Sequence, residues 1–126
     1  MKNIIQTDRA PAAIGPYSQA VDLGSIIFLS GQIALDPGSG ALVPGGIVPQ
    51  TEQVFRNIEA ILTAAGLTTA NVVKTTVFLA DIADFGTVNG IYAKHFSADY
   101  PARSAVQTAA LPKGALIEIE CIAARD

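Results

Sequence analysis

Residues 51–80 read TEQVFRNIEAILTAAGLTTANVVKTTVFLA, and the spacing of the apolar side chains changes part-way along this stretch. In its first half, small and apolar residues recur at helical spacing, at Thr51, Val54, Ile58, Ile61, Leu62 and Ala65. This spacing predicts a helix, with Pro49 near its start and Gly66 as its C-cap. Residues 72–80 are rich in β-branched side chains and almost continuously apolar, which predicts a strand buried on most of its surface.

Further strands are expected on both sides of this central stretch, at residues 17–21, 26–35, 103–109 and 116–124. The last two strands are joined by Leu-Pro-Lys-Gly at residues 111–114, which suggests a tight hairpin. A second helix is capped by Asp81 or Asp84, and its inward stripe consists of Phe85, Val88, Tyr92 and Phe96.

These ranges supply five strands and two helices in the order β-β-α-β-α-β-β, and the expected fold is α+β with a six-stranded mixed sheet. Two helices cannot cover both faces of such a sheet, so both are expected on one face. The other face is then solvated or buried against neighbouring molecules.

The composition of the chain favours burial of that face against neighbouring molecules. The chain has 126 residues, which suggests one domain spanning residues 1–126. Half of the residues are apolar, the mean hydropathy is +0.40, and 15% are charged, against about a quarter in an average soluble domain. Because no apolar run is long enough to cross a bilayer, burial between subunits is the remaining explanation, and an oligomer is expected.

Charge and targeting signals limit the partners and the cellular location that are expected. The net charge is −3 and the eight basic residues are scattered, which disfavours nucleic acid as a partner. The first six residues have no sustained apolar region, so they are not a signal peptide, and a cytoplasmic protein is expected. Because Cys121 is the sole cysteine, no internal disulfide and no cysteine-based zinc site is expected. His95 is the sole histidine, and metal motifs are missing, so no metal or organic cofactor is expected.

The last predicted strand carries two carboxylates on one face. Strand side chains alternate, so Ile117, Ile119, Cys121 and Ala123 share one uniformly apolar face that belongs against the helices. Glu118 and Glu120 then emerge on the helix-free face. A carboxylate that becomes buried there needs a partner, and Arg103 on the preceding strand is the expected one.

Arg103 and Glu118 together suggest a site for a small carboxylate. The planar guanidinium of arginine binds a carboxylate through two hydrogen bonds, and a nearby glutamate can activate a water. The spacing alone leaves two alternatives open: a structural ion pair, or a pair of glutamates on a solvated strand face.

Several segments resemble the Rid (YjgF) family. The similar segments are Ala-Pro-Ala-Ala-Ile-Gly-Pro-Tyr-Ser-Gln at 10–19, Ser-Gly-Gln-Ile at 30–33, Val-Lys-Thr-Thr-Val-Phe-Leu at 73–79, Pro-Ala-Arg-Ser-Ala-Val at 101–106, Leu-Pro at 111–112 and Ile-Glu-Ile at 117–119. They occur in order and span nearly the whole chain.

The resemblance implies a chorismate-mutase-like trimer with clefts between subunits, and hydrolysis of 2-iminopropanoate and 2-iminobutanoate to 2-keto acids and ammonia. It assigns substrate-carboxylate binding to Arg103 and water activation to Glu118. The residues that it implies for substrate binding are Tyr17, Ser30, Gly31, Asn89, Ser104 and Ala105. Many members have cysteine where this chain has Ala105, so thiol-based regulation at that position is not expected here.

Two rival functions remain at this stage. One is a binding module that holds a small 2-keto acid without turnover, although binding alone needs Arg103 and not Glu118. The other is a ribonuclease or translation inhibitor, activities attributed to some relatives, against which the acidic composition speaks. His95 is expected at the surface or at a helix end, and Lys74 is expected to pair with a carboxylate at a subunit contact.

Overall fold

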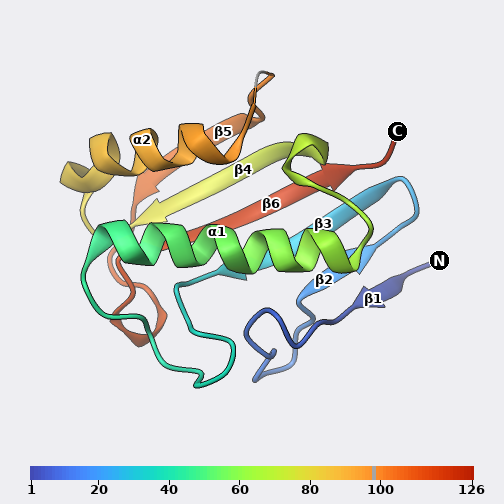
Figure 1. Ribbon diagram of the computed structural model, residues 1–126, viewed down its shortest axis with the longest axis horizontal. Helices are drawn as coiled ribbons and strands as arrows, with labels where there is room; N and C mark the ends of the chain where they lie inside the picture. Colours follow the sequence, from blue (N-terminus) through green and yellow to red (C-terminus); the bar gives the residue numbers. More distant parts are fainter. Residues whose placement is uncertain (98) are drawn as a thin grey trace.

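The computed structural model describes residues 1–97 and 99–126 and shows two helices lying across one sheet (Figure 1). The strands are β1 (Asn3–Ile5), β2 (Ala20–Asp22), β3 (Ile26–Gln32), β4 (Val72–Leu79), β5 (Ala102–Gln107) and β6 (Ile117–Ala124). The helices are α1 (Ile47–Ala64) and α2 (Phe85–His95), with short 3-10 turns η1 (Thr69–Asn71), η2 (Ile82–Asp84) and η3 (Pro112–Gly114).

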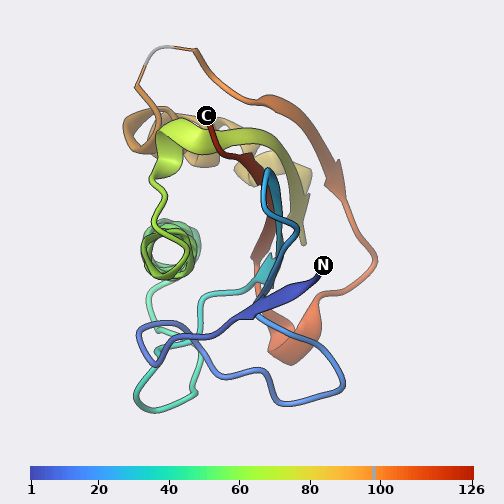
Figure 2. The same cartoon turned by 90° about the vertical axis from the view of Figure 1, so that its right-hand side faces the viewer.

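Both helices cover the same face of the sheet, as Figure 2 shows with the sheet seen nearly edge-on. The expected α+β fold, a six-stranded mixed sheet with two helices on one face, is confirmed. The sixth strand is β1, which the sequence did not indicate because three residues are too few to show a period.

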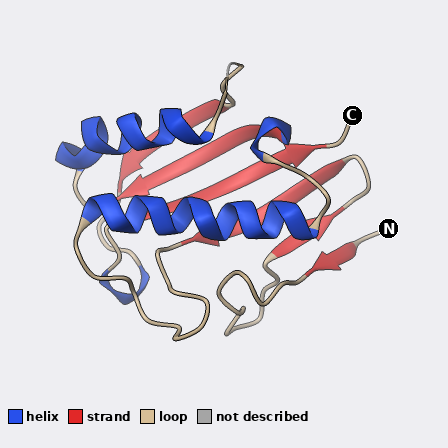
Figure 3. Cartoon of the chain, in the orientation of Figure 1, coloured by secondary structure: helices blue, strands red, loops and turns tan. Residues whose placement is uncertain are grey.

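The spatial order of the strands is β1-β2-β3-β6-β4-β5. β6 lies in the middle, antiparallel to β3 and β4, whereas β5 is an edge strand that pairs in parallel with β4. The expected hairpin between the last two strands is therefore wrong, because β4 separates them. Helix α2 makes the crossover from β4 to β5, which a parallel pair requires, and the chain then passes through η3 to reach β6 (Figure 3).

Helix α1 follows the predicted period. Its predicted inward residues are all buried, and Gly66, just past its end, has φ +77°, a left-handed conformation that glycine adopts without a steric penalty. The Leu67 amide donates to the Leu62 carbonyl at 2.8 Å, which satisfies one of the free carbonyls of the last turn.

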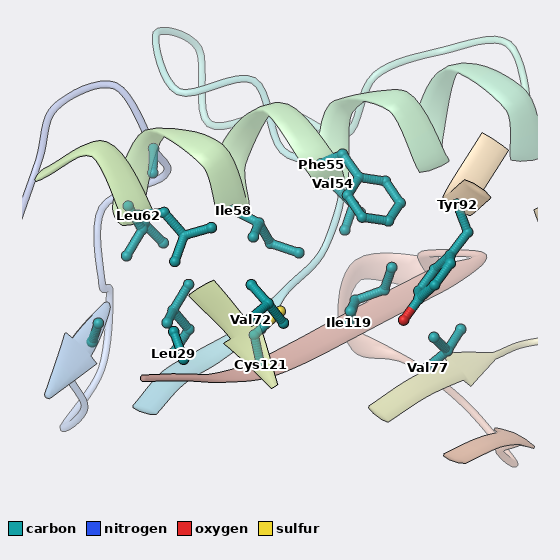
Figure 4. Close-up of a cluster of buried hydrophobic side chains, with 14 of the residues drawn as sticks. Leu29, Val54, Phe55, Ile58, Leu62, Val72, Val77, Tyr92, Ile119 and Cys121 are labelled. Atoms are coloured by element: carbon teal, nitrogen blue, oxygen red, sulfur yellow. The ribbon is translucent and has the colours of Figure 1, made fainter. Parts of the chain in front are cut away.

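The core lies between the helices and the sheet (Figure 4). Phe55 and Ile58 of α1 pack there with Ile119 and Cys121 of β6 and with the other buried apolar residues. Asn57 is also fully buried, and its amide nitrogen donates to two carbonyls of the segment that follows β3, at 3.0 and 3.2 Å. This amide therefore ties α1 to that segment.

The opposite face of the sheet is open to solvent in the single chain. Along β6 buried residues alternate with partly exposed ones, so the predicted assignment of Cys121 to the core and Glu118 to the helix-free face is confirmed. Large apolar side chains share that face: Ile26 and Phe28 of β3 are 40% and 44% exposed, and Val106 of β5 is 45% exposed.

Candidate active site

Glu118 lines a groove on the helix-free face. The groove has a volume of about 550 Å³, and its lining includes Tyr17, Ser30, Gly31, Lys113, Glu118 and Glu120. Three of the expected site residues, Tyr17, Ser30 and Gly31, thus come together with Glu118 in one chain.

Gly31 leaves the space in which the Glu118 side chain sits. The register between β3 and β6 shifts between Leu29 and Gln32, and this irregularity brings residue 31 against Glu118. A Cβ atom at position 31 would overlap the carboxylate oxygen and lie 2.9 Å from the carboxyl carbon. Gly31 is therefore needed for the position of Glu118, which is a more specific role than lining the cleft.

The environment of Glu118 raises the affinity of its carboxylate for a proton. Partial burial raises the pKa of the Glu118 carboxyl above its ordinary value of 4.5, and the negative charge of Glu120 raises this pKa further. Among the described residues, none of the ion pairs includes Glu118. General-base catalysis is most efficient when the pKa of the base lies near the working pH.

Arg103 lies in a second cavity, on the helix side of β5. Its Nη1 donates to Asn89 Oδ1 at 2.7 Å, and its guanidinium carbon lies 5.1 Å from the centre of the Phe85 ring and 4.8 Å from that of Tyr92. The cavity has a volume of about 430 Å³, and Tyr100 is part of its lining. The fork of Arg103 is thus held by one hydrogen bond and two aromatic faces.

The expected contact between Arg103 and Glu118 within one chain is wrong. Arg103 pairs in register with Thr75, which is fully buried under the helices, whereas Glu118 pairs with Phe78 on the opposite face. The two side chains leave the sheet on opposite faces with β4 between their strands. The prediction failed because it assumed a hairpin between β5 and β6.

The remaining expected site residues follow the same division. Asn89 joins Arg103 through the hydrogen bond described above, and Ala105 faces the helix side with Arg103 and packs partly against the core. Ser104 points the other way and is exposed on the helix-free face. The chain therefore carries two partial sites: the glutamate half-site (Tyr17, Ser30, Gly31 and Glu118) and the arginine half-site (Asn89 and Arg103 with the rings of Phe85 and Tyr92).

The two aromatic residues around Arg103 were expected in the core and not at the site. Phe85, Asn89 and Tyr92 are spaced i, i+4 and i+7, so they form one stripe of α2. This spacing in the sequence was a signal that the asparagine belongs with the two rings.

His95 and Cys121 belong to neither half-site. His95 stands at the end of α2, as expected, but its ring is half-buried and stacks on Phe55 at 4.2 Å. His95 Nε2 also lies 2.8 Å from Glu52 Oε1, so His95 links α2 to α1. Burial, with a smaller contribution from the charge of Glu120, raises the pKa of the Cys121 thiol to about 12, so the thiol stays protonated at neutral pH.

Residues 1–97 and 99–126 contain neither a metal-binding cluster nor a membrane-spanning helix. No group of three or more His, Cys, Asp or Glu side chains in that part of the chain is placed to hold a metal ion. In the same described ranges, no helix has the length and apolar character to span a bilayer.

Comparison with known proteins identifies the family. The family model described as Endoribonuclease L-PSP matches residues 7–125. A crystal structure from Yersinia pestis, described as a protein of the conserved Rid family, superimposes with a TM-score of 0.96 at 50% identity and covers 99% of this chain and 100% of its own. The chain belongs to the Rid (YjgF) family.

Two further relatives bear on the chemistry of this Rid protein. It is 57% identical over 123 residues to the mouse (Mus musculus) protein named 2-iminobutanoate/2-iminopropanoate deaminase, a match that covers 98% of this chain and 91% of the mouse protein. The crystal structure of Escherichia coli TdcF with bound serine superimposes with a TM-score of 0.91 at 47% identity, covering 98% of this chain and 99% of TdcF.

Proposed function

We propose that this Rid protein hydrolyses 2-imino acids, including 2-iminopropanoate and 2-iminobutanoate, to 2-keto acids and ammonia. The observation that carries the proposal is the presence of two complementary half-sites on opposite faces of one sheet. One holds an arginine fork suited to a carboxylate, and the other holds a partly buried glutamate suited to activating water. The name of the mouse relative and the serine bound to TdcF, itself a small carboxylate, support the same class of substrate.

The complete site is proposed to form between subunits of a homotrimer. The arginine half-site of one copy meets the glutamate half-site of the next, because neither half alone contains both the carboxylate-binding group and the base. Apolar side chains on the helix-free face, Ile26, Phe28 and Val106 among them, offer the surface for this association. A trimer agrees with the expectation from composition that this face is covered by other copies.

In the proposed mechanism Arg103 binds the substrate carboxylate and places the imine carbon beside Glu118 of the neighbouring copy. Glu118 takes a proton from a water molecule while the water oxygen attacks that carbon, and the C=N bond becomes a C–N single bond. Glu118 then returns the proton to the amino nitrogen. The C–N bond breaks as the hydroxyl group becomes the C=O of the keto acid, and the hydroxyl proton passes through Glu118 to the departing ammonia, which leaves as ammonium. Positioning of the reactants supplies part of the rate gain, and a protonated imine is electrophilic enough to need no metal or organic cofactor.

The test is a competition for a short-lived imine. Threonine dehydratase generates 2-iminobutanoate, semicarbazide traps it as a semicarbazone, and added protein competes with the trap. Wild type is expected to lower semicarbazone formation, whereas Arg103→Ala and Glu118→Gln should not. Arg56→Ala, which removes an exposed guanidinium from α1, is the matched control and should behave like wild type.

The same assay separates the rival functions. A binding module would bind 2-ketobutyrate in wild type, measured by calorimetry, yet leave the semicarbazone yield unchanged. The family description names an endoribonuclease, but a net charge of −3 gives little attraction for phosphate backbones. RNA cleavage by wild type that Glu118→Gln leaves intact would place a nuclease activity outside the proposed site.

A cytoplasmic location is also proposed. The single cysteine is a buried free thiol, which agrees with a reducing cytoplasm.

A further inference from the structure

Two buried hydroxyl groups are paired directly beneath the arginine half-site. Thr75 Oγ1 and Tyr92 Oη lie 2.7 Å apart, and both residues are buried, with exposed fractions of 0% and 4%. Tyr92 points its hydroxyl from α2 toward the strands in Figure 4. Burying two hydroxyl groups among apolar side chains is costly unless they bond each other, so phenylalanine opposite valine would fill this core position with less difficulty.

The pair closes a ring of contacts around Arg103. Thr75 of β4 is the register partner of Arg103 of β5, and Tyr92 of α2 places its ring 4.8 Å from the guanidinium carbon. The hydroxyl bond therefore anchors the far end of the Tyr92 ring to the strand next to the arginine. The plane and depth of the ring are then fixed from two sides, by the α2 backbone and by Thr75.

From this geometry we infer that Tyr92, anchored by Thr75, is a positioning residue that holds the Arg103 fork in the orientation that receives the substrate carboxylate. The inference rests on the proposed function for the identity of the ligand. Tyr92 is too deeply buried to act on the imine itself, so its effect passes through Arg103. Phe85 and Asn89 also contact Arg103, but only the hydroxyl pair explains why a tyrosine occupies position 92.

The alternative is a hydrogen bond that stabilises the core and has no effect on Arg103. The two readings differ in what they predict for substrate binding. A loosened Arg103 weakens the hold on the carboxylate in the ground state and the transition state alike, so KM rises while kcat changes little. A bond that matters only for stability lowers the unfolding temperature and leaves KM unchanged.

The kinetic test uses the intact assembled protein and four variants. Tyr92→Leu removes the aromatic face and is expected to raise KM for the imine, and Kd for 2-ketobutyrate, roughly tenfold. Tyr92→Phe and Thr75→Val each break the hydroxyl bond and are expected to raise both constants about threefold, with the double variant no worse than either single one. Val88→Ala, at a fully buried position on the same helix, is the control: it should lower the unfolding temperature without changing KM.

A second readout does not depend on turnover. Aromatic rings shift the resonances of protons above their faces, so the Arg103 guanidinium protons should give displaced NMR signals, assigned by their loss in Arg103→Ala. These signals should move in Thr75→Val, which keeps the Tyr92 ring but frees its hydroxyl end, and not in Val88→Ala. If they move while wild type hydrolyses no imine, the positioning role stands and the proposed function fails. Unchanged signals together with an unchanged KM in Thr75→Val would overturn the positioning role.

Discussion

Complementation between two inactive variants gives the sharpest test of a site shared between copies. Arg103 and Glu118 lie on opposite faces of one sheet, so one chain alone does not bring them together. Arg103→Ala and Glu118→Gln are each expected to lose roughly 100-fold or more in kcat/KM. In a mixed trimer, an interface with a Glu118→Gln chain on its arginine side and an Arg103→Ala chain on its glutamate side contains both intact residues. Random assembly from equal amounts makes about one quarter of the interfaces complete.

The assay is refolding of the two variants together, followed by measurement of semicarbazone suppression per mole of assembled protein. Native mass spectrometry with one variant carrying a tag confirms that mixed assemblies form. Activity near a quarter of the wild-type value is the expected result. Wild type mixed equally with the double variant should also give about a quarter, whereas a site contained in one chain would give about a half. Mixed assemblies without recovered activity would refute a site that spans two copies.

Three further outcomes follow from the described contacts. Gly31→Ala should lower kcat roughly tenfold or more while leaving the unfolding temperature nearly unchanged, because the new methyl group displaces the end of the flexible Glu118 side chain and not the backbone. An unchanged kcat would mean that Glu118 does not act from this position. Because the ionised Glu118 acts as base and Glu120 raises its pKa, Glu120→Gln should move the acidic limb of the kcat/KM profile to lower pH, and a shift to higher pH would contradict this. Asn57→Leu should lower the free energy of unfolding by about 2–3 kcal/mol in urea titrations at fixed protein concentration, with little change in kcat. The reason is that two partly buried carbonyls lose the Asn57 amide as a donor.

Local patterns in the sequence were sufficient for both helices, for five of the six strands and for the direction of the side chains along α1 and β6. The helical spacing from Thr51 to Ala65 predicted the buried side of α1, and strand alternation predicted that Glu118 leaves β6 on the face opposite Cys121. Both follow from the geometry of one segment, in which neighbouring residues decide the outcome. The segments similar to the Rid family also led to the family that the comparisons confirm.

Which segments become neighbours was decided by the tertiary structure. The sequence suggested that β5 and β6 form a hairpin, but α2 carries β5 to the far side of β4 and β6 returns to the middle of the sheet. That topology separates Arg103 from Glu118 and places Tyr92 and Thr75 beneath the guanidinium instead. Alternation along a strand determines which side chains share a face, but it does not determine which strands become neighbours. Strand order depends on the crossover helix and on which apolar surfaces bury each other. The sequence alone therefore determined all the elements except β1, together with the chemical groups of the site. Only the packing of distant segments decided how those groups divide into two half-sites.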